Sequence, residues 1–438
     1  MERCTIRYTT MEEPMRKLGL FLTMLLISQA LFSKNLSLQE AINATLSSHP
    51  DAKLALYRID TSRENMGITK ASSYPELNLN AEYFPTKTLV MPSNGSFSTK
   101  EHATSHIDAT ITYTLWDFGR TQKRLDAAYQ DVESSLFLNE NARALLIEKV
   151  WQTYYSLAYI YRLNDANVLS LAFYKALYEQ ANQMKNIGLK TEADKERFYA
   201  SWLEAQDLLE TSRNEEQKLL HLLSMLTGIE ESTIVIEDDF KAFSNTSVST
   251  FSTLEWKALL KEHNGELQAL HTKIKQSQLL YEASKREHYG TLSTVGSVGA
   301  DTSLSAYNTT QIGVKASIPL FTAGKLTHQE ERERVGLLSA HETLRSRELS
   351  LWQELYEALL DAKRLDNTVN AKKMAALALS KTVLITKGRY AEGLATYIEV
   401  LEAQKAYDNA YIAQNIAMLQ KISTLAKIKR LIPQGANL

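Results

Sequence analysis

The sequence repeats itself once over about half its length, and this duplication constrains the fold more than any other feature. The segment TLWDFGR, which ends at Arg120, resembles PLFTAGK, which ends at Lys325. The segment GLKTEAD, which begins at Gly188, resembles GLATYIE, which begins at Gly393. Both pairs have the same offset of 205 residues. The sequence therefore predicts two copies of one structural unit.

The offset changes at one place along the chain. Near the starts of the copies, Leu38 and Leu254 stand 216 residues apart, so the first copy carries about 10 extra residues before Gly119. Residues 85–105 are longer than their counterparts, residues 301–308. We therefore expect a longer loop at residues 85–105.

Each copy reads as helix, strand, loop, strand, long helix, tight turn and helix. Only 7 Pro and 16 Gly occur in 438 residues, which favours long helices. The predicted helices span residues 37–73, 120–186, 191–227, 254–288, 325–388 and 395–431. The predicted repeats are residues 34–227 and 254–432, joined at residues 228–253 by a polar linker with little regular structure. The longest helix would extend ~100 Å at ~1.5 Å per residue, so we expect an extended coiled bundle built from the hairpins 120–227 and 325–431.

Four segments alternate apolar and polar residues at a period of two, as strands do. They are residues 76–84, 106–116, 291–300 and 310–320. A strand that crosses a bilayer at a tilt has ~9–11 residues, which fits these lengths. Glu82, Asp108 and Lys315 lie on the polar side, as in a water-filled lumen, and aromatic residues cluster at the strand ends. A half-buried sheet in a soluble protein would alternate too, but these features favour membrane strands.

Four strands cannot close a membrane barrel, whose smallest form has about 8 strands. An open sheet edge cannot face lipid, because its backbone groups would lack hydrogen-bond partners. The fold class is therefore mainly helical with membrane β-strands, and the chain must oligomerise. Two, three or four copies would all supply enough strands, and the residues alone do not choose among them.

The N-terminal residues have the features of an export signal. A basic start at Met15–Lys17 is followed by the apolar run LGLFLTMLLI and by Ala30, after which we expect cleavage, with Ser33 as the next candidate. The run is shorter than the ~20 residues of a membrane-spanning helix. Residues 1–33 are therefore interpreted as a signal peptide region. Cys4 is the only cysteine and lies within it, so the exported chain should have no disulfide.

Two other classes of protein fit the sequence less well. An enzyme is not indicated, because no HExxH, GxSxG or phosphate-loop motif occurs, and a polar loop explains His102 and His106 better than a metal site does. No cofactor is therefore expected, and the formal net charge of -2 gives no reason to expect a nucleic acid partner. The alternative is a periplasmic coiled-coil adaptor or tether, which would have one helical hairpin between β-domains rather than two hairpins with matching strand pairs.

Several motifs together resemble the TolC-like outer-membrane efflux proteins. They are LQEA from Leu38 with Pro50 soon after, the Gly-Arg and Gly-Lys pairs after the second strand of each copy, and GLATYIEVLEAQ from Gly393. The resemblance covers about residues 36–431. It implies a homotrimer with a 12-stranded barrel among the lipids of the outer membrane and a helical tunnel across the periplasm. It also implies passive export of substrates that an inner-membrane pump of the RND or ABC type delivers through a periplasmic adaptor.

The turn of each helical hairpin is the place where this family contacts its adaptor. Gly188 and Gly393 are expected to end helices with a positive φ, and that role alone would explain both glycines. By resemblance, these glycines and the neighbouring Leu189 and Leu394 form the adaptor docking site, with the two leucines exposed.

The start of the second helix in each hairpin carries the candidate gate. Thr396 and Glu399 have the spacing of a capping box, as do Thr191 and Asp194, and capping explains these carboxylates as well as gating does. Glu402 lies one turn beyond Glu399 on the same helical face, too far along to cap. By resemblance, Glu399 and Glu402 form an acidic constriction in the trimer, where carboxylate rings select cations.

The resemblance further implies a lock that holds the tunnel closed. Tyr390 matches a tyrosine that bonds to the neighbouring hairpin, and Asp194 matches its partner. The family's arginine in this lock has no counterpart, because Ala395 occupies its position. The lock is therefore expected to be weaker here unless Arg389 or Lys190 substitutes.

Overall fold

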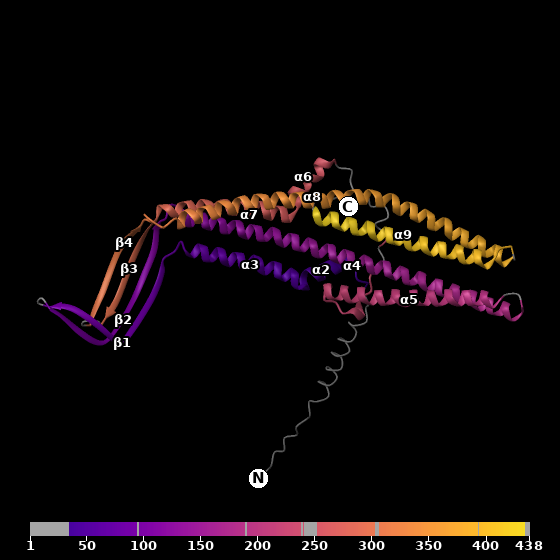
Figure 1. The fold of residues 1–438 in the computed structure, drawn as a ribbon, viewed down its shortest axis with the longest axis horizontal. Helices are drawn as coiled ribbons and strands as arrows, with labels where there is room; N and C mark the ends of the chain where they lie inside the picture. Colours follow the sequence, from indigo (N-terminus) through magenta and orange to yellow (C-terminus); the bar gives the residue numbers. More distant parts are fainter. Residues whose placement is uncertain are drawn as a thin grey trace, which may run out of the picture.

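The computed structural model describes residues 35–93, 96–188, 191–237, 240, 252–302, 306–392 and 394–433. The expected signal peptide region, residues 1–33, lies outside these ranges. The described residues form an elongated bundle of helices with a four-stranded sheet at one end (Figure 1). Among the helices described, none is both long and apolar enough to span a membrane.

The two copies form matching sets of helices, each arranged along one long helix. The first set is α2 (Leu38–Ser48), α3 (Pro50–Ala71), α4 (Arg120–Asn186) and α5 (Glu192–Thr227). The second set is α6 (Thr253–His263), α7 (Gly265–Arg286), α8 (Lys325–Ala391) and α9 (Tyr397–Leu431). Helices α4 and α8 have 67 residues each. The shorter helices α3 and α5 lie end to end along α4, as α7 and α9 do along α8 (Figure 1). We call α4–α5 the first hairpin and α8–α9 the second hairpin.

The first helix predicted in each copy, residues 37–73 and residues 254–288, is in fact two helices. Each prediction is wrong at a single extended residue, His49 or Asn264, where the helix is interrupted. His49 is extended (φ -64°, ψ 134°), because the proline that follows disfavours a helical conformation at the residue before it. Asn264 is also extended (φ -82°, ψ 113°), and its side chain accepts a hydrogen bond from Leu267 N as the N-cap of α7.

These two joints hold the ends of the hairpins in equivalent ways. Ser48 Oγ donates to Thr227 O (2.8 Å) at the end of α5, and Asn264 Nδ2 donates to Leu431 O (3.1 Å) at the end of α9. Carbonyls in the last turn of a helix lack partners within the helix, so a side chain from the neighbouring helix satisfies one in each copy. The duplication therefore extends to the hydrogen bonds at the joints.

The segment between the copies contributes to the largest hydrophobic cluster. Leu36 pairs with Ile236 in a parallel bridge, and Ile234, Ile236 and Phe240 are buried beside Tyr154 of α4. The Tyr154 hydroxyl donates to Leu36 O (2.8 Å). The described part of residues 228–253 before α6 has little regular structure, as expected, with one short 3-10 helix (Glu231–Thr233) and this bridge. It is nevertheless not only a polar linker, because its apolar side chains pack against α4.

Two smaller clusters pack the remaining helices. One includes Trp256, Leu351 and Leu355 and joins α6, α7, α8 and α9. The other includes Phe198 and Tyr397 and joins the two hairpins near their free ends. The core therefore follows the length of the bundle instead of forming a single centre.

The strands form one antiparallel sheet in the order β1-β2-β3-β4. They are β1 (Glu76–Ser93), β2 (Ser96–Trp116), β3 (Thr291–Asp301) and β4 (Tyr307–Ser317). The expectation of a loop at residues 85–105 is wrong. Strands β1 and β2 extend into this segment and pair with each other as far as Ser93↔Ser96. The sequence there contains Asn94-Gly95, a dipeptide typical of two-residue hairpin turns. The polar composition of residues 85–105 favoured a loop over a strand pair, although the segment contains this dipeptide.

Both copies enter their long helix through the same left-handed turn. Phe118 and Gly119 have φ values of 58° and 75°, and Ala323 and Gly324 have values of 50° and 82°. Left-handed conformations are unusual for residues other than glycine, so their recurrence at Phe118 and Ala323 shows a duplicated backbone as well as a duplicated sequence.

Candidate functional site: the faces of the sheet and the ends of the hairpins

The register of the sheet separates polar from apolar side chains. The pairing of the four strands puts Glu82, Asp108 and Lys315 on one face. Neighbouring positions on that face hold amide and hydroxyl side chains, namely Asn78, Asn80, Thr110, Ser297, Thr309 and Gln311. The alternation seen in the sequence therefore produces one polar face that crosses all four strands.

Asp108 is the centre of a polar cluster on this face. Its carboxylate accepts hydrogen bonds from Asn80 Nδ2 (3.1 Å) and Thr110 Oγ1 (2.5 Å). His106 Nε2 lies 3.1 Å from Asp108 Oδ1, and His106 Nδ1 lies 3.2 Å from Asp301 Oδ2 on β3. The imidazole therefore joins two carboxylates from adjacent strands. Within the part of the chain that the structure describes, no group of three or more potential ligands is arranged to hold a metal ion.

The opposite face of the sheet is apolar and exposed in the single chain. Its large side chains are Leu77, Leu79, Ile107, Ile111, Val298, Ile312 and Val314. Ile312, on the edge strand β4, is 89% exposed. Contiguous apolar surface of this kind marks a contact with membrane or with another protein.

The two hairpins have their turns at the same end of the molecule, opposite the sheet (Figure 1). Gly188 follows α4 with a φ of 76°, as a helix end with glycine requires. Leu394 lies in the turn after α8, where its N–H donates to Arg389 O (2.7 Å) and Arg389 Nη2 donates to Leu394 O (3.1 Å). The Leu394 side chain is 64% exposed. Leu189 and Gly393 lie outside the described residues.

Helix α9 begins with the capping box that the sequence predicts. Thr396 N donates to Glu399 Oε1 (3.3 Å), and Glu399 N donates to Thr396 Oγ1 (3.4 Å). Both Glu399 and Glu402 are exposed in the single chain. Capping therefore accounts for Glu399 locally and still leaves two acidic side chains one turn apart on an exposed surface.

Tyr390 lies where aromatic side chains join the two hairpins. It is half-buried against a cluster that contains Phe198 of α5 and Tyr397 of α9, whose ring centroids lie 4.5 Å apart. Burial and the neighbouring Tyr397 raise the pKa of the Tyr390 hydroxyl, so this group remains a neutral donor. Asp194 lies in the first turn of α5, but its side chain is outside the described part, and Arg389 bonds within its own turn. The bond between Tyr390 and Asp194 stays a prediction.

Ion pairs connect α4 to α5 at the free end of the first hairpin, and the sequence did not predict them. Glu192, at the start of α5, forms ion pairs with Lys185 of α4 and with Lys195 one turn along α5. Hydrogen bonds from these two ammonium groups lower the pKa of Glu192 to about 2. The carboxylate therefore stays ionised at neutral and mildly acidic pH.

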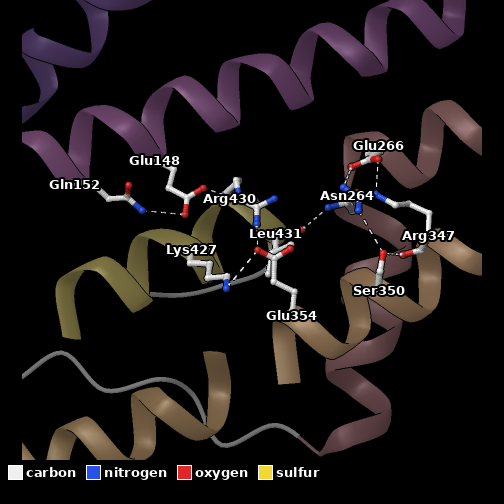
Figure 2. Close-up of polar contacts among 10 residues, drawn as sticks. All are labelled: Glu148, Gln152, Asn264, Glu266, Arg347, Ser350, Glu354, Lys427, Arg430 and Leu431. Carbon is white, nitrogen blue, oxygen red and sulfur yellow. Dashed lines mark hydrogen bonds and ion pairs between the residues drawn. The ribbon is translucent and has the colours of Figure 1, made fainter. Parts of the chain in front are cut away.

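Arg430, near the end of α9, connects the two copies through Glu148 of α4 and Glu354 of α8 (Figure 2). Its Nε lies 2.6 Å from Glu148 Oε2 of α4, and its Nη2 donates to Glu354 of α8 (2.5 Å). The Arg430 side chain is only 8% exposed. Burial raises the pKa of Glu148, although Arg430 opposes this shift. Figure 2 also shows Arg347 Nη2 donating to Glu266 (2.9 Å), which joins α8 to α7.

Curated proteins of similar sequence include outer-membrane proteins. The chain is 24% identical over 390 residues to outer membrane protein TolC of Salmonella enteritidis, an alignment that covers 81% of this chain and 73% of the relative. It is 23% identical over 395 residues to outer membrane protein TolC of Escherichia coli K12, with 83% and 75% covered.

Solved structures show the same fold. A membrane protein from Pseudomonas aeruginosa matches with a TM-score of 0.78 at 18% identity, over 90% of this chain and 93% of the other. The outer membrane protein VceC of Vibrio cholerae matches with a TM-score of 0.76 at 17% identity, over 90% and 95%. The sequence profile of the family described as "Outer membrane efflux protein" matches residues 41–228 and 256–433. This match covers most of the sequence, and the chain therefore belongs to the outer membrane efflux protein family.

Proposed function

We propose that this chain is the exit duct of a tripartite efflux or type I secretion system. It passively exports substrates that an inner-membrane pump of the RND or ABC type delivers through a periplasmic adaptor. The observation that carries the proposal is the four-stranded sheet, which has one polar face, one exposed apolar face and two edge strands, β1 and β4. Family membership supports it independently.

Three chains would complete the sheet as a closed barrel of 12 strands in the outer membrane. Strand β4 of one chain would pair with β1 of the next, which removes every exposed edge. The apolar face would contact lipid, and the face with Glu82, Asp108 and Lys315 would line the water-filled lumen. The helices would extend from this barrel into the periplasm as a tunnel ~100 Å long.

The acidic side chains at the start of α9 would form the narrow end of this tunnel. Three-fold symmetry would repeat the exposed Glu399 and Glu402 as two rings of carboxylates, which favour cations over anions. Tyr390 and Asp194 would hold neighbouring hairpins together beside these rings. The gate would therefore combine an electrostatic filter with a contact that has to break for wide opening.

A periplasmic adaptor or tether explains the structure less well. Such a protein has no need of a second hairpin or of an exposed apolar sheet face, and both are present. An enzyme is not proposed, because the similar proteins are efflux channels and the polar clusters described above are ion pairs and caps.

The docking role of the hairpin turns gives an experiment that tests the function. A strain that lacks the gene is complemented with the wild-type chain, with Leu394→Glu and with the matched control Leu254→Glu. Leu254 is equally apolar and 81% exposed but lies at the start of α6, far from the turns (Figure 1). We expect Leu394→Glu to reach the outer membrane and to lose export, because a charge would have to be buried against the adaptor. Full export by Leu394→Glu, alone and together with Leu189→Glu, would contradict docking at these turns.

A further inference from the structure

Asp408 lies at the contact between the two hairpins, about two helical turns beyond Glu399 and Glu402. A cavity of about 210 Å³ opens there between α4, α5 and α9. The half-buried Asp408 carboxyl of α9 accepts a hydrogen bond from Ser170 Oγ of α4 (3.2 Å) and from Gln404 Nε2 of its own helix (2.8 Å). The Tyr174 hydroxyl of α4 also donates to it. One carboxyl group therefore connects the first hairpin to the second.

This carboxyl group has only neutral donors around it. Lys405, the cation that lines the same cavity, lies with its Nζ 3.6 Å from Glu204 of α5. None of the ion pairs among the described residues includes Asp408. Tyr174 and Tyr407 are the other titratable groups nearby, and burial raises the pKa of both hydroxyls, so they stay neutral. Burial without a cation penalises the carboxylate more than its three hydrogen bonds stabilise it, so the pKa of Asp408 is raised overall.

We propose that Asp408 is a proton-linked latch, which holds the two hairpins together when it is protonated and favours their separation when it is ionised. The inference rests on the proposed channel function, because separation of the hairpins would widen the tunnel. Separation would expose the carboxyl group to the water that enters the 210 Å³ cavity, where its charge is solvated. The latch is a property of this chain's own side chains and requires no ligand.

The direction of the pH effect follows from linkage. Burial raises the pKa of Asp408 above its ordinary value of 3.8 when the hairpins are packed, and hydration would return it to that value when they separate. The packed form therefore binds the proton more tightly, so acidification favours it. As the pH rises from 3.8 through the raised pKa, packing weakens, and above that pKa the effect is complete.

Pulsed electron paramagnetic resonance on the assembled full-length protein tests this proposal. Nitroxides are attached to cysteines at Gln206 of α5 and Lys381 of α8, two exposed residues, in a Cys4→Ser background. Labelled chains are diluted with unlabelled ones so that each oligomer carries a single labelled copy. The distance distribution is recorded from acid to neutral pH for the wild type, Asp408→Asn, Asp408→Ala and the control Glu210→Gln, which removes an exposed carboxylate of α5.

The two Asp408 variants are expected to differ from the wild type in opposite directions. The wild type and Glu210→Gln should show a separated population that grows several-fold as the pH rises. Asp408→Asn keeps the shape and stays neutral, so it should remain packed at every pH. Asp408→Ala loses the hydrogen bonds between α4 and α9, so it should be more separated than the wild type even in acid.

Two results would overturn the latch. One is a wild-type distribution that does not change with pH, and the other is an Asp408→Asn profile that follows the wild type. A merely structural role would make both variants separate without any change in the pH profile. The proposed function is checked separately by measuring the ion conductance of the same protein in planar bilayers. If the protein conducts ions but the distance between the two nitroxides does not change with pH, only the latch is refuted.

Discussion

Replacement of Arg430 by methionine should destabilise the protein by about 2–3 kcal/mol. Methionine keeps most of the side-chain volume but leaves Glu148 and Glu354 without their shared cation. Loss of one partner from a buried ion pair costs about 3–5 kcal/mol. The cost here lies at or just below the lower end of that range, because the Glu354 side chain is 30% exposed and keeps Lys427 at 3.4 Å. The unfolding entropy of about 2.1 cal/mol/K per residue converts this loss to a fall in melting temperature of about 3 °C for 438 residues.

The loss should depend on pH in a defined direction. Burial already raises the pKa of Glu148 above its ordinary value of 4.5, and removal of Arg430 removes the main opposing influence. A carboxyl group whose pKa is raised in the folded state stabilises that state when protonated, and this contribution is lost as the pH rises through the raised pKa. The Arg430→Met penalty should therefore be largest at neutral pH and should shrink as the pH approaches 4.5.

Thermal unfolding in detergent, followed by circular dichroism at pH 7.5 and pH 5, measures both effects. Arg364→Met is the matched control, because Arg364 pairs with Asp361 at 3.0 Å while both side chains are more than half exposed. Such a surface pair contributes less than about 1 kcal/mol, so the control should melt within about 1 °C of the wild type. An Arg430→Met variant that melts like the control, or that loses more stability in acid than at neutral pH, would refute the reasoning.

Three further changes test other parts of the structure. Leu355→Ala removes a fully buried side chain from the cluster around Trp256 and should lower the free energy of unfolding by about 2–5 kcal/mol in the same thermal unfolding assay. A loss below about 1 kcal/mol would show that this cluster is loosely packed. Gly290→Ala should prevent β3 from forming, because the added Cβ would lie 2.2 Å from Ser317 O at a φ of 84°; normal assembly of this variant would show that the turn is wrong. Glu399→Gln with Glu402→Gln retains the capping box but removes both charges, so single-channel recordings should show reduced cation selectivity, and unchanged selectivity would place these residues away from the constriction.

Regular periodicity made much of the fold predictable from the sequence. A strand alternates its side chains strictly, so the polar face with Glu82, Asp108 and Lys315 could be read before the register was known. Duplicated motifs located the two hairpins in the same way. The breaks at His49 and Asn264 were missed, because one extended residue hardly alters a helical pattern.

Contacts between residues far apart in the chain were not predictable. Nothing in the sequence brings Glu148, Glu354 and Arg430 together, because their meeting depends on how α4, α8 and α9 pack. The same holds for Asp408 and Ser170 between the two hairpins. Residues 228–253 looked like a linker because their apolar side chains are scattered among polar ones, and only the packing against α4 reveals their role.

The number of chains in the detergent-purified protein tests the central claim most directly. Native mass spectrometry of the protein extracted from the outer membrane measures it. Closure of the four-stranded sheet through its edges β1 and β4 predicts an oligomer and no stable single chain, and the proposed 12-stranded barrel sets the number of chains at three. A homogeneous single chain that retains the β-sheet signal in circular dichroism would contradict the account, because the sheet edges and the apolar face would then be stable without partners.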